Sequence, residues 1–125
     1  MYRPLVLLSY AFDYAVGEYG GLGYHLTNLA IHLAVTGLLY LVLKNLGATA
    51  GAAAAGALLF GVHPLTTEPV NYISSRSESM AVMFCVASFL LYLRTGRHRS
   101  IAVLSVAGFA AALLSKSVAI GFPLV

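Results

Sequence analysis

The sequence predicts an all-α fold: a polytopic membrane helix bundle of about four transmembrane helices, an N-terminal interfacial helix and a truncated C-terminal helix. Hydrophobic residues make up 60% of the 125 residues and charged residues only 9%, whereas soluble domains average about 45–50% and about 25%. The apolar residues form long runs between short polar segments, and the mean hydropathy is +0.88. The net charge is only +3, and the cations are scattered along the chain. This excludes a nucleic-acid-binding surface.

The first apolar segment, residues 5–16, is interrupted by Ser9 and Asp13, so we expect an interfacial or re-entrant helix. Four further runs are predicted to be membrane helices. The first of them would be about 30 Å long, enough to cross a hydrocarbon core. The runs are residues 24–43, 46–62, 79–93 and 101–114, and a further apolar segment begins at Val118.

Local signals mark the ends of these helices. Proline disfavours helix in the residue before it, so His63-Pro64 is expected to end the second run. The residues from Ser75 to Glu78 match an S-x-x-E capping box, which predicts the start of the third. Gly47, Gly51 and Ala55 are spaced as small residues that let helices approach closely.

The segment 63–78 is predicted to be a polar loop with a functional role. It holds three of the chain's eleven charged residues, beside a histidine and two prolines, and charge next to a membrane is costly unless it is paired or used. A guanidinium can grip a phosphate with two parallel hydrogen bonds, which makes Arg76 and Arg3 candidates, with Lys116 as an added point charge. The alternative is that Arg76 pairs with an acid of this segment, Glu68 or Glu78.

Other polar residues allow a chemical and a structural interpretation. Glu68 could be a general base or an acid favoured by a helix start, and His63 could end a helix by bonding its last carbonyls. His25, Asn28 and His32 share one helix face by their spacing. We favour hydrogen bonding within the bundle for them, because the two histidines would lie about 10 Å apart along the helix, too far for a metal site.

The cations orient the predicted helices. One side would carry cations without any acid, and the positive-inside rule places that side, residues 94–99 above all, in the cytoplasm. The loop 63–78 would then be non-cytoplasmic. The cytoplasmic set is Lys44, Arg94, Arg97 and Arg99, and the other side carries Arg3, Arg76, Lys116, Asp13, Glu18, Glu68 and Glu78.

Four motifs, in order and nearly spanning the chain, resemble those of the C-type membrane glycosyltransferases of the protein O-mannosyltransferase kind, especially the transmembrane and tetratricopeptide-repeat group and its bacterial relatives. The motifs are Tyr2-Arg3-Pro4-Leu5 with Ser9, Asp13 and Tyr14; Tyr24-His25 with Asn28 and His32; His63-Pro64 with Glu68, Val70, Ile73, Arg76 and Glu78; and Leu114-Ser115-Lys116.

The resemblance implies an integral membrane enzyme that moves a sugar from a polyprenyl-phosphate donor to a protein or glycan acceptor on the non-cytoplasmic side. Mannose is the family's best-known sugar, and the membrane would be the bacterial cytoplasmic or the endoplasmic reticulum membrane. By this analogy Arg76, Arg3 and Lys116 would hold the donor phosphate. No cofactor or metal is assigned. The scaffold around the site would be His63, Glu68, Glu78, His25 and Asn28.

The resemblance also implies that residues 1–125 are one transmembrane segment of a larger glycosyltransferase domain. In the family the catalytic carboxylates lie on a first external loop, upstream of the Tyr-Arg-Pro motif, so no catalytic residue is assigned here. We expect the chain to be a fragment that lacks the first helix, that loop and the C-terminal part, and to be inactive alone. A transporter, a lipid-handling protein and an inactive structural membrane module remain alternatives.

Overall fold

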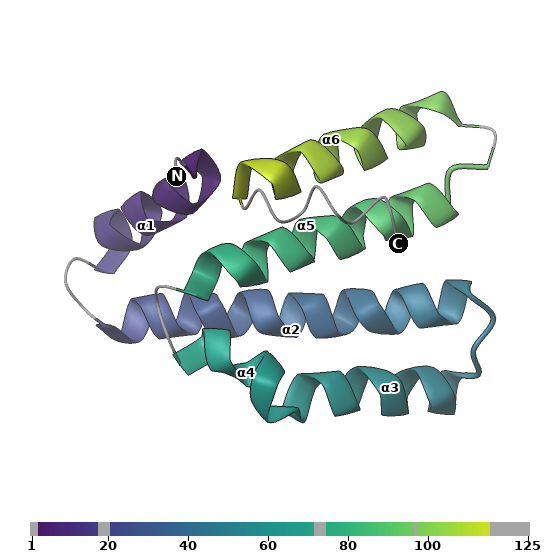
Figure 1. Cartoon of the computed structure of the whole chain (residues 1–125), viewed down its shortest axis with the longest axis horizontal. Helices are drawn as coiled ribbons and strands as arrows, with labels where there is room; N and C mark the ends of the chain where they lie inside the picture. The colour runs from purple at the N-terminus through teal and green to yellow at the C-terminus, as the bar shows by residue number, and fades with distance from the viewer. Residues whose placement is uncertain (1–2, 18–20, 72–74, 97, 116–125) are drawn as a thin grey trace.

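The computed structural model describes residues 3–17, 21–71, 75–96 and 98–115, the side chains of residues 17, 21 and 68–71 excepted. Its regular structure in these ranges is entirely helical, which confirms the all-α prediction (Figure 1). The helices are α1 (Pro4–Gly17), α2 (Gly21–Asn45), α3 (Ala50–Val62), α4 (Pro64–Asn71), α5 (Arg76–Leu93) and α6 (Arg99–Ser115).

Two helical hairpins lie side by side. In Figure 1 the four helices of these hairpins follow one another in the order α3, α2, α5, α6, and each is in contact with the next. The short helix α4 joins the two hairpins, and α1 packs beside the end of the bundle at which α2 begins. This arrangement brings the starts of α1, α2 and α5 together.

Two of the predicted membrane helices are long and apolar enough to cross a membrane, namely Leu22–Asn45 and Arg76–Leu93. The segments Pro4–Val16, Ala50–Val62 and Arg99–Ser115 are shorter apolar helices. The predicted runs 46–62 and 101–114 form helices of 13 and 17 residues, the first too short and the second at the lower end of the roughly 17–25 residues that span a hydrocarbon core.

The small-residue face predicted around Gly47 is wrong. Gly47 lies in the turn after α2 with a φ of +96°, a conformation open to glycine because it has no Cβ. The helix α3 begins only after Thr49, whose hydroxyl caps it by accepting from the N–H of Ala52. Gly51 and Ala55 then lie on an exposed face.

A different set of small residues packs α3 against α2. Ala53 and Ala57 are buried, and a Cβ added to Gly56 would lie 3.0 Å from Leu43 of α2. A Cβ added to Gly61 would lie 3.3 Å from Thr36. The prediction of close packing holds, but the helix start at Ala50 rotates a different face toward the partner helix.

The predicted loop 63–78 is wrong in its middle part. Residues 64–71 form α4, with Pro64 at the first helical position, where its missing N–H costs nothing. The helix α5 follows Ser75, as the capping-box pattern predicts, but begins at Arg76, three residues before the predicted run. The Ser75 hydroxyl makes no capping hydrogen bond, so the helix starts where the pattern predicts although Ser75 does not supply its bond of that motif.

Two serines join α5 to α6. The Ser88 hydroxyl donates to the carbonyl of Ser105 at 2.6 Å, and the Ser105 hydroxyl donates back to the carbonyl of Ser88 at 2.8 Å. A Cβ added to Gly108 would lie 3.4 Å from the Ser88 Cβ. Close approach and paired hydrogen bonds therefore hold this hairpin, as expected between helices that share an apolar environment.

Candidate functional site

Arg76 lies at the first turn of α5 and is fully enclosed, with 0% of its surface exposed. Its Nε donates to the Asn28 side chain of α2 at 2.6 Å, and its Nη1 donates to the Asp13 carboxylate of α1 at 2.5 Å. The Nη2 donates to the backbone carbonyl of Tyr24 at 2.9 Å. One guanidinium thus ties together three helices that are distant in the sequence.

Aromatic rings and a hydroxyl complete the enclosure of Arg76. Its guanidinium carbon lies 4.7 Å from the ring centre of Tyr10 and 5.7 Å from that of Tyr24, which favours a desolvated cation. Its Nη1 also reaches the Ser9 hydroxyl at 3.4 Å. Burial raises the pKa of the Tyr10 phenol, against the opposing effect of Arg76, so this ring stays neutral.

Asp13 is the acidic partner that the sequence interpretation missed. It is 6% exposed, and the second oxygen of its carboxylate accepts a hydrogen bond from the Thr27 hydroxyl at 2.8 Å. The alternative considered from the sequence paired Arg76 with Glu68 or Glu78, but among the described side chains, which do not include Glu68, the ion pair of Arg76 is with Asp13. An acid inside an apolar segment was the signal, because such a group requires a partner.

Arg3 lies beside the same helix start. Its Nη1 donates to the hydroxyl of Ser77, the residue after Arg76, at 2.9 Å. Its Nε is buried and has no hydrogen-bond partner among the described residues. The two predicted phosphate-binding arginines are therefore brought together, but their surroundings differ: the charge of Arg76 is neutralised by Asp13, while Arg3 keeps an unused donor.

The other predicted site residues are more dispersed. Glu78 lies exposed in the first turn of α5. The exposed His63 ends α3, as predicted, but through its own backbone N–H, which donates to the carbonyl of Phe60. Glu68 belongs to α4, with its side chain outside the described part of the chain, and Lys116 lies outside the described residues altogether.

The polar face predicted on α2 is divided by the packing. Asn28 and His32 are buried, with 1% and 7% of their surfaces exposed, whereas His25 is exposed at the start of the helix. Asn28 accepts from Arg76, and the Nε2 of His32 bonds the backbone carbonyl of Gly61 at 2.9 Å. Asn28 and His32 thus hydrogen-bond within the bundle, as we favoured.

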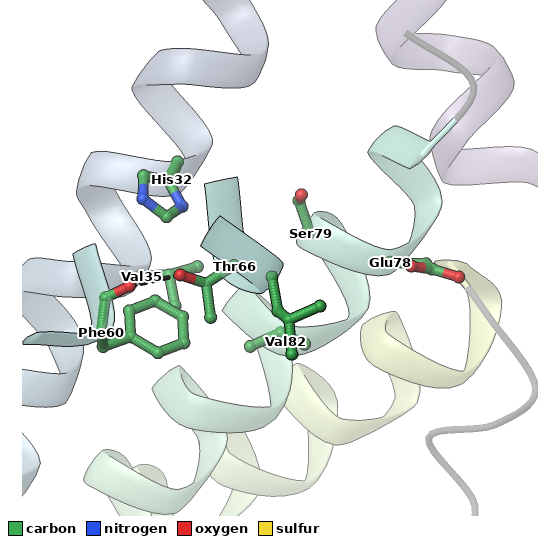
Figure 2. Close-up of a pocket in the computed structure, with 8 residues that line it drawn as sticks. His32, Val35, Phe60, Thr66, Glu78, Ser79 and Val82 are labelled. Atoms are coloured by element: carbon green, nitrogen blue, oxygen red, sulfur yellow. Dashed lines mark hydrogen bonds between the residues drawn. The ribbon is translucent and has the colours of Figure 1, made fainter. Parts of the chain in front are cut away.

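A cleft of about 200 Å³ opens between α2, the α3–α4 junction and α5. Figure 2 shows Phe60 and Thr66 on one side of it and Ser79 and Val82 on the other, with His32 above Phe60. The sequence interpretation did not include this cleft, because its walls come from segments up to 50 residues apart. Its lining residues are His32, Val35, Phe60, Leu65, Thr66, Glu78, Ser79 and Val82.

The charges are sorted toward opposite ends of the bundle. Lys44 near the end of α2, Arg94 after α5 and Arg99 at the start of α6 belong to the end where both hairpins turn (Figure 1). Arg3 and the pair of Asp13 and Arg76 belong to the opposite end. The grouping of cations predicted from the sequence is thus preserved for the described residues.

Comparison with known proteins gives one consistent set of relatives. The chain is 38% identical over 125 residues to protein O-mannosyl-transferase Tmtc1 of Drosophila melanogaster, a match that covers 95% of this chain and 14% of that protein. It is 35% identical over 94 residues to protein O-mannosyl-transferase TMTC3 of Homo sapiens, covering 75% of this chain and 10% of that protein. A Xenopus laevis relative, protein O-mannosyl-transferase tmtc2, is 37% identical over 93 residues, 74% of this chain and 11% of its own length.

The chain thus spans only 10% to 14% of the length of these relatives. No family model matches the sequence, and no solved structure matches it. The resemblance that the four motifs indicate is confirmed by these matches, which cover most of the chain.

Proposed function

We propose, from the homology of this chain to a segment of the protein O-mannosyl-transferases, that it forms the donor-phosphate side of a membrane glycosyltransferase of that kind. The donor would be a polyprenyl-phosphate-linked sugar, and the acceptor a protein or glycan on the non-cytoplasmic side. The names of the relatives support transfer of mannose to protein.

The observation that carries this proposal is the position of Arg3 at the start of α5. Its guanidinium is held by Ser77 through Nη1 and keeps a buried Nε without a partner among the described residues. The start of a helix presents backbone N–H groups and a partial positive charge. An arginine beside such a start suits a phosphate, because charge-assisted hydrogen bonds from both sources can converge on its oxygens.

Arg76 would support this site instead of contacting the phosphate itself. Its guanidinium is fully buried and already bonded to Asn28, Asp13 and the carbonyl of Tyr24. By fixing α1 against α5 it holds Arg3 next to Ser77. We therefore assign phosphate contact first to Arg3 and a positioning role to Arg76, with Lys116 as a further candidate cation.

The charge distribution supports a direction in the membrane. The end with Lys44, Arg94 and Arg99 would face the cytoplasm under the positive-inside rule. The start of α5 would then lie toward the outside of a bacterial cell or the lumen of the endoplasmic reticulum. Donor phosphate and acceptor would meet on that side.

A chimera tests the proposal. The matching segment of Drosophila Tmtc1, aligned over 125 residues, is replaced by this chain, and mannosyl transfer from a polyprenyl-phosphate donor is measured in microsomes. Arg3→Ala is expected to raise the KM for the donor by about tenfold or more, as for the loss of a charge-assisted hydrogen bond of about 1.5–3 kcal/mol. Arg3→Lys should recover part of this loss, because it keeps the charge without the planar fork.

Arg99→Ala at the opposite end of the bundle is the matched control, and its KM should stay unchanged. An Arg3→Ala chimera with the donor KM of the unmodified chimera would overturn the assignment of the phosphate to this site. A chimera that binds no donor at all would overturn the proposed function itself.

A further inference from the structure

We infer that the cleft between α2, α4 and α5 is a binding subsite for a neutral, hydroxyl-rich ring, a single hexose unit. For the identity of that hexose as mannose, the inference rests on the proposed function; its chemical class follows from the cleft itself. The volume of about 200 Å³ is that of about seven water molecules at roughly 30 Å³ each, a space suited to one sugar ring.

The break between α3 and α4 creates the anchor of this subsite. Pro64 has no N–H to offer the carbonyl of Phe60, and the N–H of Leu65 turns to the Nδ1 of His63 at 3.2 Å instead of to Gly61. The carbonyl of Gly61 therefore does not accept from Leu65 and bonds instead to the Nε2 of His32, 2.9 Å away. Because a carbonyl oxygen can only accept, this nitrogen must carry a proton.

The bond to Gly61 decides what His32 offers to a ligand. In the neutral ring the other nitrogen, Nδ1, is an acceptor, and it has no partner among the described residues. The ring is held in place by stacking on Phe60, with 5.8 Å between centroids. His32 lines the cleft, so the subsite contains a pre-oriented acceptor for a hydroxyl group.

The opposite wall adds a second polar group and an apolar surface. The Ser79 hydroxyl of α5 makes no hydrogen bond to a described residue, while Val82 and Phe60 present apolar surface across the cleft (Figure 2). A sugar ring has the same division, with hydroxyl groups at its edge and C–H groups on its faces. Few oriented polar groups in an apolar cleft are typical of small-molecule sites.

Two other occupants fit less well. A hydrocarbon chain would cover His32 and Ser79 without replacing their hydrogen bonds to water, which is costly. A phosphate would meet the carboxylate of Glu78, which also lines the cleft, and like charges repel. A neutral polyol satisfies the polar groups and avoids that repulsion.

Histidine NMR tests this inference on the 125-residue chain in phosphatidylcholine nanodiscs. The chain has four histidines, and His32→Gln identifies the signals of His32. Titration with methyl mannoside is expected to give a saturable change of the Nδ1 nitrogen shift of His32, and none for His25 or His98. Absence of this change up to about 100 mM, far above a millimolar dissociation constant, would overturn the inference.

Matched variants locate the binding. Val82→Phe fills the cleft and is expected to weaken the mannoside about tenfold or more. Val103→Phe makes the same change on the exposed face of α6, where 65% of the valine is exposed, and should leave binding unchanged. Ser79→Ala should weaken it about threefold relative to Ser100→Ala. Equal effects of the two phenylalanine variants would place the sugar elsewhere.

Two further probes distinguish the occupants. N-acetylthreonine amide represents a protein acceptor, and decane represents a hydrocarbon chain. If either one changes the NMR signal of His32 while the mannoside does not, the hexose assignment is wrong. In the Tmtc1 chimera, Val82→Phe should reduce mannosyl transfer and Val103→Phe should not. Normal transfer by Val82→Phe would overturn this subsite and leave the phosphate role of Arg3 standing, whereas failure of the Arg3 prediction leaves the nanodisc titration unaffected.

Discussion

Asp13 and Arg76 form a buried ion pair with 2.5 Å between Oδ2 and Nη1, although 63 residues separate them in the sequence. The pair joins α1 to α5, and the bond from Nε to Asn28 adds α2. The charges of Arg76 and Asp13 compensate each other only while α1 and α5 remain in contact. We therefore expect the network to determine the geometry of this end of the bundle.

Removing Arg76 should destabilise the chain more than removing the pair. Arg76→Met leaves the Asp13 carboxylate buried without its cation and is expected to lower the free energy of unfolding by about 3–5 kcal/mol. Adding Asp13→Asn should recover part of the loss, because the amide is neutral and still accepts from Thr27. Unfolding by SDS in mixed micelles, followed by circular dichroism, measures both. Strictly additive losses would contradict the pairing.

The φ of +96° at Gly47 predicts a position-specific cost. Gly47→Ala should lower the free energy of unfolding by about 1–2 kcal/mol, because a Cβ is disfavoured in the left-handed region. Gly51→Ala is the control: Gly51 lies in α3 with no atom within 4 Å of an added Cβ, so alanine should stabilise by about 0.5–1 kcal/mol. Thermal unfolding of both variants checks the contrast, and equal shifts would be incompatible with the turn.

The α5–α6 hairpin should be sensitive to size at Gly108. A Cβ there would lie 3.4 Å from that of Ser88, so Gly108→Leu should separate the helices and break the paired bonds of Ser88 and Ser105, at a cost of about 1–3 kcal/mol. Gly37→Leu on α2, with no atom within 4 Å, serves as the matched control. Cysteines at Ser88 and Ser105 should cross-link readily in the Gly37 variant and poorly in the Gly108 variant.

The proposed direction in the membrane is tested by labelling. In a Cys85→Ala background, a cysteine at Ser74 should react with an impermeant thiol reagent added outside intact cells, and a cysteine at His98 should not. The reason is the cluster of cations near His98, which favours the cytoplasmic side. The reverse labelling pattern would show the opposite orientation.

Local signals were sufficient for every described helix except α4. Hydropathy predicted the four helices of the two hairpins, His63-Pro64 predicted the end of α3, and Ser75 marked the start of α5. Errors arose where a local signal allowed more than one outcome. The segment after Pro64 was polar enough for a loop but also suited a helix start, and Gly47 was counted in a helix that begins only after Thr49.

The candidate site was predicted in part. The sequence singled out Arg3, Arg76 and Asn28, and the structure brings Arg76 together with Asn28 and Arg3 next to Ser77. It did not provide the partner of Arg76, since an acid inside an apolar segment signals that a partner is required but does not tell which cation supplies it. The cleft beside His32 was also missed, because its walls come from helices that are brought together only by the packing.

The sequence by itself determined the helical class, the approximate helix limits, the sorting of charges and the family resemblance, because each depends on residue type and spacing along the chain. Only the tertiary structure decided which acid neutralises Arg76, which small residues face α2 and where a ligand could enter. These three features depend on the rotation of each helix about its axis and on contacts between residues that lie dozens of positions apart in the sequence. A shift of one residue in a helix start turns a side chain by about 100°, so packing alone selects the face that is buried.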